Sequence, residues 1–197
     1  MPNSHNRDKE ENIKGSGAVK RRLVLLGVCA SIAAYKACDI INNLRRGGID
    51  VSVCMSKDAD KFITPLLLQT LSANRVFKDM FEPAAEWDPL HISLAESADL
   101  VLVCPATSDI ISRVACGLCD DLLSCVIAST KAPVFFAPAM NDAMYNNKIL
   151  QANIDKLKRI GYNFIGPIKG RLACGREGIG HIAEASDIIK QVKARLK

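Results

Sequence analysis

Short apolar runs alternate with longer amphipathic segments along most of this chain. The apolar runs show no polar residue at every second position, which is typical of strands buried on both faces of a sheet. Strands are predicted over residues 23–28, 51–55, 100–104, 134–137 and 162–165. Apolar positions spaced three and four apart predict helices over residues 31–46, 64–73, 107–115, 122–129, 147–160 and 185–196. This order predicts an α/β fold in which helices cover both faces of a parallel sheet.

The first 20 residues differ from the rest because they are polar and show neither period. Such a segment buries too little apolar surface to offset its chain entropy, so we expect a mobile tail over residues 1–20. The remainder, residues 21–197, is predicted to form one domain, since its length suits a single hydrophobic core.

Charge and composition argue against nucleic-acid and membrane partners. The formal net charge is +5, but residues 1–22 hold six Lys/Arg against three Asp/Glu, so the remainder is nearly neutral. Aromatic residues make up 5% of the chain, which leaves no obvious stacking platform for bases. Apolar runs such as residues 100–106 are far shorter than the roughly 20 residues that span a bilayer.

We interpret most of the eight cysteines as buried thiols of a cytoplasmic protein. The cysteines that lie within apolar runs are Cys29, Cys38, Cys54, Cys104 and Cys125. Cys116 and Cys119 form a C-x-x-C pair, but no second ligand pair follows at zinc spacing. We therefore expect no metal site and no disulfide scaffold. Asp120 and Asp121, which follow this pair, are predicted to cap the helix over residues 122–129.

Segments rich in small and polar residues follow several predicted strands, and in an open α/β sheet the ligand crevice lies beyond the carboxyl ends of the strands. In residues 27–36, Ser31 opens a predicted helix, where it either caps the helix or also binds a phosphate. Ser56, after the second strand, either adds a hydroxyl to the same anion or is a turn serine. The dinucleotide fingerprint G-x-G-x-x-G is absent from residues 27–36.

Two later segments also follow predicted strands. In residues 105–109, Thr107 and Ser108 place two hydroxyls at a helix start, as a cap or where a flat ring or phosphate approaches the backbone. In residues 138–145, the amide of Asn141 can both donate to and accept from a ligand. Methionines precede and follow this Asn, although Met at such spacing more often fills a core.

Two further residues carry proton or thiol chemistry. His91 precedes the third predicted strand, so we expect it towards the end of that strand opposite the crevice, where it reaches a ligand through a folded-over loop or from a neighbouring subunit. Cys174 lies among Gly and Arg in a late predicted loop with four glycines, residues 170–181. Arginine favours a thiolate, so Cys174 is either a reactive thiol or an incidental one on an exposed flap.

Six segments together resemble the flavin-containing cysteine decarboxylases. They are GVCASIAAYK at 27–36, WDPLHISL at 87–94, PATSD at 105–109, CDDLLS at 119–124, PAMNDAMY at 138–145 and GRLACGREGIG at 170–180. The resemblance runs from about residue 21 to the end of the chain, in order and at family spacing. It implies a three-layer, Rossmann-like (flavodoxin-like) fold, the cofactor FMN, and a homotrimer or homododecamer whose active site lies at a subunit interface.

The same resemblance implies roles for individual residues. Ala30, Ser31, Ile32 and Ser56 would lie on the phosphate and ribityl side of FMN, Thr107, Ser108, Asp109 and Ile110 would hold its phosphate and ring, and Ala139 and Met140 would line the isoalloxazine. His91 matches the catalytic histidine and Cys174 the active-site cysteine. Asn141 matches the ligand of the substrate carboxylate, and Met144 and Ala173 are also assigned to the substrate.

The chain departs from the family pattern at several of these or neighbouring positions. Cys29-Ala30 stands where Ser or Thr followed by Gly is common. Asp109 stands where Asn is usual, Ile110 where Thr is usual, Tyr145 where Trp is usual and His181 where Arg is usual. Of these, Asp109 matters most physically, because a carboxylate beside a phosphate is repelled unless it faces away.

The implied reaction is the FMN-dependent decarboxylation of a small phosphorylated cysteine conjugate, 4'-phosphopantothenoylcysteine, to 4'-phosphopantetheine in coenzyme A biosynthesis. Hydride transfer from the cysteine β-carbon to FMN gives a thioaldehyde, which serves as the electron sink for loss of CO2. His91 would assist the oxidation and Asn141 would align the carboxylate. Cys174 would donate a proton when the enethiol is reduced.

Two alternatives remain open. A peptidyl-cysteine decarboxylase of lantibiotic maturation shares the histidine and the Pro-x-Met-Asn motif, but resembles this chain less at residues 172–175. A flavin-binding regulatory subunit without turnover would not need His91, Asn141 and Cys174 together. Because the chain ends at Lys197, we also expect the preceding ligase step to be carried either by a separate polypeptide or by a further part of a longer chain.

Overall fold

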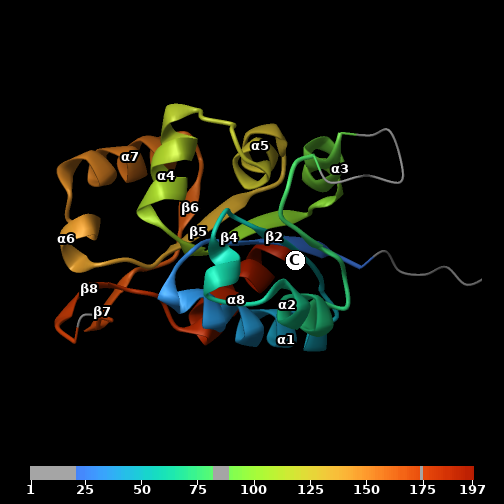
Figure 1. The fold of residues 1–197 in the computed structure, drawn as a ribbon, viewed down its shortest axis with the longest axis horizontal. Coiled ribbons are helices and arrows are strands. Elements are labelled where there is room, and N and C mark those ends of the chain that lie inside the picture. Colours follow the sequence, from blue (N-terminus) through green and yellow to red (C-terminus); the bar gives the residue numbers. More distant parts are fainter. Residues whose placement is uncertain (1–20, 82–88, 174) are drawn as a thin grey trace, which may run out of the picture.

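The computed structural model describes residues 21–81, 89–173 and 175–197 of this chain (Figure 1). The tail expected over residues 1–20 lies outside the described residues, as does the candidate Cys174.

The centre of the fold is a six-stranded sheet in which every neighbouring pair is parallel. Its order is β3-β2-β1-β4-β5-β6. The strands are β1 (Leu23–Val28), β2 (Asp50–Met55), β3 (Val76–Phe77), β4 (Leu100–Ala106), β5 (Val134–Pro138) and β6 (Asn163–Phe164). Without the short edge strand β3, this is the order of a flavodoxin-like doubly wound sheet. The predicted fold class is confirmed.

Helices cover both faces of the sheet, so that three layers result (Figure 1). One face carries α1 (Lys36–Arg46), α2 (Pro65–Ser72) and α8 (Ala185–Leu196), and the other carries α3 (Leu90–Ser97), α4 (Ser108–Cys116), α5 (Leu122–Ser129) and α7 (Lys148–Arg159). Alternate strand residues feed two separate cores: Leu26 packs with α1 and α8, whereas Leu25 packs with α4 and α5. β1, β4 and β5 are buried almost throughout, as their unbroken apolar runs predict.

Several elements were not predicted. They are the 3-10 turns η1 (Ile32–Tyr35) and η2 (Ala59–Lys61), the strand β3, the helices α3 and α6 (Asp142–Tyr145), and the antiparallel hairpin of β7 (Ile168–Arg171) and β8 (Glu177–His181). The expectation of a loop over residues 170–181 is therefore wrong. The predicted helix over 31–46 begins instead as η1, and the predicted strand over 162–165 is limited to residues 163 and 164.

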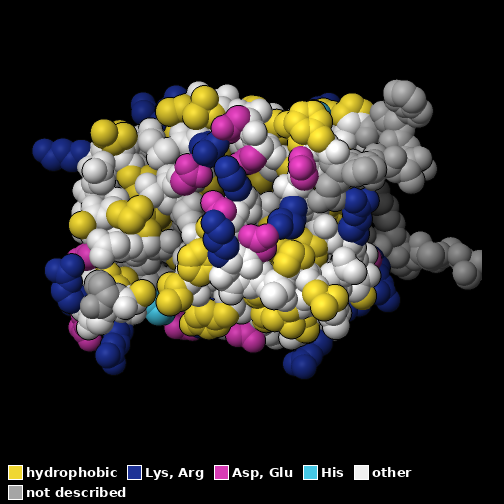
Figure 2. All heavy atoms as spheres, in the orientation of Figure 1, with side chains coloured by type: hydrophobic (Ala, Val, Ile, Leu, Met, Phe, Trp, Pro, Cys, Tyr) yellow, Lys and Arg dark blue, Asp and Glu magenta, His cyan; other side chains and the backbone are white. Residues whose placement is uncertain are grey.

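The described residues can be compared with the expectations about nucleic-acid, membrane and metal partners. Figure 2 shows acidic and basic side chains intermingled over the middle of one face. Within the described residues, no helix combines the length and apolar character that a bilayer crossing requires. Across residues 21–81, 89–173 and 175–197, no group of three or more His, Cys, Asp and Glu side chains is arranged to hold a metal ion.

Candidate functional site

The sheet order places a crevice at the carboxyl ends of β1 and β4. β1 pairs with β2 on one side and with β4 on the other, so the chain leaves these neighbouring strands towards opposite faces of the sheet. Ligands of open α/β sheets bind at such a reversal of strand order. The candidate residues after β1, β2, β4 and β5 therefore meet at one edge of the sheet.

The segment after β1 turns directly into η1. Ser31, in extended backbone, caps η1 by accepting a hydrogen bond from the Ala33 N–H at 3.3 Å, so the predicted cap is confirmed. Gly27 lies inside β1 itself, where a Cβ would come within 2.8 Å of the Leu123 side chain. This glycine therefore serves the packing of α5 on the sheet and does not widen a phosphate loop.

Cys29, directly after β1, is fully buried between the segments that follow β2 and β4. Burial raises the pKa of its thiol to about 12, although hydrogen bonds with the Thr107 backbone and the Ser56 side chain oppose the rise. The Asp121 and Asp109 carboxylates add to it. These contacts show that the ends of β1, β2 and β4 lie together, as their positions along the chain predict.

The segment after β4 forms the N-terminus of α4. Thr107 caps this helix by accepting from the Ile110 N–H at 3.4 Å, and Ser108 is its half-buried first residue. The Ile110 side chain is 1% exposed and belongs to the core beneath α4. The Ile110 side chain therefore does not face the crevice.

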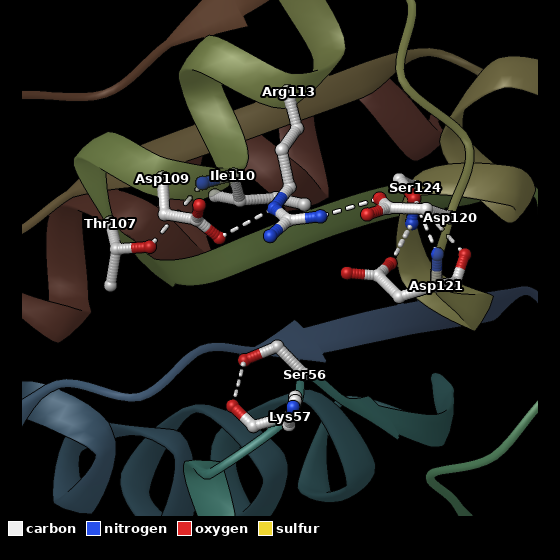
Figure 3. Close-up of polar contacts among 9 residues, drawn as sticks. All are labelled: Ser56, Lys57, Thr107, Asp109, Ile110, Arg113, Asp120, Asp121 and Ser124. Carbon is white, nitrogen blue, oxygen red and sulfur yellow. Dashed lines mark hydrogen bonds and ion pairs between the residues drawn. The ribbon is translucent and has the colours of Figure 1, made fainter.

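Asp109 does not point into the helix N-terminus but lies along the flank of α4 (Figure 3). Its Oδ2 accepts from Arg113 Nε at 2.8 Å, one helical turn further on. Arg113 also donates through Nη1 to Asp120, in the connection to α5. Asp121 caps α5 through a hydrogen bond from the Ser124 N–H at 2.7 Å, so the expected acidic cap is Asp121 alone.

The segment after β5 is held by backbone hydrogen bonds on two sides. The Ala139 N–H donates to the Ala106 carbonyl at 3.0 Å, and the Met140 N–H donates to the Gly180 carbonyl at 3.0 Å. The Oδ1 of Asn141 accepts from the Ala143 N–H at 2.9 Å and so caps α6. This cap fixes the orientation of the Asn141 amide beside β8.

Two glycines in β8 allow this strand to lie close to the segment after β5. A Cβ on Gly180, whose φ is +142°, would lie 2.3 Å from the Met140 carbonyl oxygen. A Cβ on Gly178 would lie 2.8 Å from the Asp142 side chain. The glycines that suggested a loop therefore let a β-hairpin dock against the Asn141 segment.

A cavity of about 500 Å³ opens between the ends of β1 and β5 and this hairpin. Its walls are mostly apolar, with a few polar groups, which is the composition of small-molecule sites. It is lined by Ser31, Ile32, Ala33, Tyr35, Ala139, Met140, Asn141, Arg171, Leu172, Ala173, Gly180, His181 and Ile182.

The cavity brings together only part of the predicted site. Its walls include Ser31, Ile32, Ala139, Met140, Asn141 and Ala173. Its walls do not include Ala30, Ser56, Thr107, Ser108, Asp109 and Ile110, which lie at or beside the adjoining strand ends, nor Met144, which is 49% exposed on α6.

His91 does not line the cavity. It is half-buried in the first turn of α3, and α3 lies at the end of the molecule opposite the hairpin and α6 (Figure 1). The expectation that His91 lies away from the crevice of its own chain is confirmed.

Sequence reasoning missed the contributions of Tyr35, Leu172 and Ile182 to the cavity. Tyr35 is 57% exposed at the end of η1, next to the small residues Ala33 and Ala34. His181, known from the sequence only as a departure from the family pattern, also lines the cavity. Its Nδ1 lies 3.1 Å from the Arg171 carbonyl oxygen, and this contact orients the ring within the hairpin.

A family model described as "Flavoprotein" matches residues 12–197. The coenzyme A biosynthesis bifunctional protein CoaBC of Borreliella burgdorferi is 43% identical over 171 residues, which cover 87% of this chain and 44% of that protein. The chain thus spans less than half the length of such curated relatives. A probable phosphopantothenoylcysteine decarboxylase of Streptococcus mutans is 42% identical over 178 residues, which cover 88% of this chain and 98% of the relative.

Solved structures with a similar fold include a decarboxylase and an FMN-binding protein. A cysteine-to-serine mutant of a PPC decarboxylase, complexed with pantothenoylaminoethenethiol, matches with a TM-score of 0.78 and 30% identity over 89% of this chain and 98% of that one. The FMN-binding protein AtHal3 matches with a TM-score of 0.74 and 31% identity over 89% of this chain and 96% of that one.

Proposed function

The chain belongs to the flavoprotein family, and from this premise we propose that it is an FMN-dependent decarboxylase that converts 4'-phosphopantothenoylcysteine to 4'-phosphopantetheine in coenzyme A biosynthesis. The relative from Streptococcus mutans supports this substrate, since the match covers nearly all of that protein. The structural observation that carries the proposal is the cavity that joins Asn141 to the β7–β8 hairpin beside Ser31.

The residues present fit a flavin. Ile32, Ala139 and Met140 offer apolar surface to a flat ring within a cavity of about 500 Å³. The capped helix starts at Ser31 and Thr107 offer backbone N–H groups and a favourable dipole to a phosphate. When bound, FMN supplies a two-electron acceptor that makes the substrate cysteine carbon ready to lose CO2.

The chain's own residues then bind the substrate and move its protons. Asn141, oriented by its cap on α6, is placed to donate to the substrate carboxylate. We also assign to the substrate Ala173, which lines the same cavity, and Met144, which is exposed on α6. We assign His91 as the proton acceptor for the substrate thiol and Cys174 as the proton donor that completes the product, as the resemblance implies. The placement of Cys174 lies outside the described residues.

A site made by His91 and Asn141 requires a second copy of the chain, because His91 does not line the cavity of its own subunit. We therefore propose a homo-oligomer, a trimer or dodecamer, with the active site at the subunit interface. Ile32, Tyr35, Phe62, Leu66 and Leu67 are each at least 44% exposed and offer apolar surface for such contacts. Figure 2 shows apolar side chains gathered along the edge formed by α1 and α2.

The cellular setting follows from the same proposal. We propose that residues 21–197 are the decarboxylase domain, that it works in the cytoplasm, and that a ligase on another polypeptide or chain segment supplies its substrate. None of the seven described cysteines forms a disulfide, which agrees with a reducing compartment.

Purified protein offered two substrates tests the proposal. We expect a flavin absorption spectrum and release of CO2 from 4'-phosphopantothenoylcysteine, with 4'-phosphopantetheine as the product. A peptide ending in cysteine is the competing substrate, and turnover of the peptide alone would assign the chain to the peptidyl-cysteine decarboxylases. Bound flavin without turnover of either compound would favour a regulatory subunit.

A further inference from the structure

The mechanism proposed above gives no role to the ion-pair cluster of Asp109, Arg113 and Asp120 (Figure 3). We propose that Arg113 is a positioning residue that holds the Asp109 carboxylate along the flank of α4, away from the phosphate of FMN at the start of this helix. The inference rests on the proposed function, because it requires a phosphate-bearing cofactor at this place.

The geometry of the cluster supports a positioning role. Arg113 Nε donates to Asp109 Oδ2 at 2.8 Å, and Nη1 donates to Asp120 on the other side of the guanidinium. The planar guanidinium presents donors in fixed directions, so contact with Asp120 sets the direction of the Nε–H towards Asp109. The Arg113 side chain is 30% exposed, whereas those of Asp109 and Asp120 are 67% and 63% exposed.

Asp109 would otherwise compete with a bound anion. It is the second residue of α4, in the first turn, where a carboxylate is attracted to the helix dipole and to the N–H groups that have no partner within the helix. Turned in that direction, it would occupy the groups that a phosphate needs and repel the phosphate as well. Arg113 removes both effects by offering the carboxylate a partner further along the helix.

The other acidic groups nearby, Asp120 and Asp121, also have partners that fix their positions. Asp121 accepts the Ser124 N–H as the cap of α5, so it is tied to a different helix. Asp120 holds the other side of Arg113, which keeps the pKa of the Asp120 carboxyl below its ordinary value. The cluster thus ties the start of α4 to the connection before α5, next to buried Cys29.

A double-mutant cycle on the full chain tests the proposal, with Arg113→Gln, Asp109→Asn and the double variant. Binding of FMN and of riboflavin, which lacks the phosphate, is measured by flavin fluorescence after removal of the native flavin. We expect Arg113→Gln to weaken FMN binding roughly five- to tenfold when Asp109 is present, and less than about twofold in the Asp109→Asn background. Riboflavin binding should change less than about twofold in every variant, because it carries no phosphate.

The outcomes separate this inference from the proposed function. If Arg113→Gln lowers FMN affinity by the same factor in the wild-type and Asp109→Asn backgrounds, Arg113 acts by its charge alone. The positioning role is then overturned. An equal loss for riboflavin would make the effect structural and would overturn it as well. Wild-type protein that binds neither flavin would overturn the proposed function itself.

Asp120→Asn is the matched control, since the Asn amide oxygen can still accept from Arg113 Nη1 and the Asp109–Arg113 pair stays in place. We expect its FMN affinity to stay within about twofold of the wild type. A loss as large as that of Arg113→Gln would show that bracing of the α5 connection, and not Asp109, is what matters. Urea unfolding of each variant checks that the fold is retained.

Discussion

Cys29 is a buried thiol at the centre of the strand ends, and its environment makes a pH-dependent contribution to stability. Its pKa of about 12 in the native state exceeds the unfolded value of roughly 8.5. The folded chain therefore keeps the proton that the unfolded chain loses in alkali. The stabilisation is fully present below about pH 8.5 and is lost as the pH rises towards 12.

We predict that the free energy of unfolding falls with pH more steeply in the wild type than in Cys29→Ala. Between pH 8.5 and 10.5 the wild type should lose about 2 kcal/mol more than the variant, measured by urea unfolding. Below pH 7 the two curves should run parallel, because the thiol is then protonated in both states. Parallel curves above pH 8.5 would show that Cys29 ionises in the native protein.

Single residues also show what the sequence could and could not reveal about the site. Ser31 and Asp121 were predicted as helix caps because their side chains bond the nearby backbone, and such local bonds depend on adjacent residues alone. The direction of the Asp109 carboxylate depends on Arg113 and on a connection that leads to Asp120. Repulsion between Asp109 and a phosphate was evident from the sequence, whereas the arrangement that relieves it was not.

Among the elements, the β7–β8 hairpin depends on one glycine for its contact with the rest of the protein. Gly180 combines a φ of +142° with a Cβ position 2.3 Å from the Met140 carbonyl oxygen. We predict that Gly180→Ala lowers the free energy of unfolding by about 2–5 kcal/mol, because strain and overlap add. Urea unfolding measures the loss.

Gly175→Ala is the control for this prediction. Gly175 has a φ of +84° in the same hairpin, but a Cβ there meets nothing within 4 Å. Gly175→Ala should lower the free energy of unfolding by about 1–2 kcal/mol, from backbone strain alone. Equal losses in the two variants would mean that the hairpin does not need its close contact with the Met140 carbonyl.

The elements that the sequence predicted are those with long, regular patterns. The unbroken apolar runs of β1, β4 and β5 and the spaced apolar positions of α1 and α7 needed no knowledge of tertiary contacts. The hairpin was missed because glycine disfavours strands and its residues there are selected for docking, not for strand propensity. β3, with two residues, is too short to show a period.

At the scale of the whole molecule, the cavity is assembled from segments far apart in the chain. Ser31 follows the first strand, Asn141 follows the fifth, and Ala173 belongs to the hairpin connection. The rule that ligands bind at the carboxyl ends of parallel strands was enough to predict the first two. The contribution of Ala173 depends on the docked hairpin, and the order of the strands alone does not predict where the hairpin lies.

The position of His91 leads to a prediction about the assembled protein. A subunit with His91→Asn keeps its Asn141, and a subunit with Asn141→Asp keeps its His91. Each variant alone should be inactive under the proposed mechanism. If His91 of one subunit acts on the cavity of the next, a mixed oligomer contains some interfaces where both native residues meet.

We predict that mixing the two variants in equal amounts, with subunit exchange, restores about one quarter of the wild-type rate, because a quarter of the interfaces then pair two intact residues. Decarboxylation of 4'-phosphopantothenoylcysteine measures the recovery. Co-refolding each variant with itself is the control and should restore nothing. If both residues served the same subunit, no mixture could form an intact site, so an inactive mixture of correctly assembled oligomers would exclude a shared site. Because the apolar surface of Ile32 and Tyr35 borders the cavity, a neighbouring subunit seated there would also bring its residues to the cavity mouth.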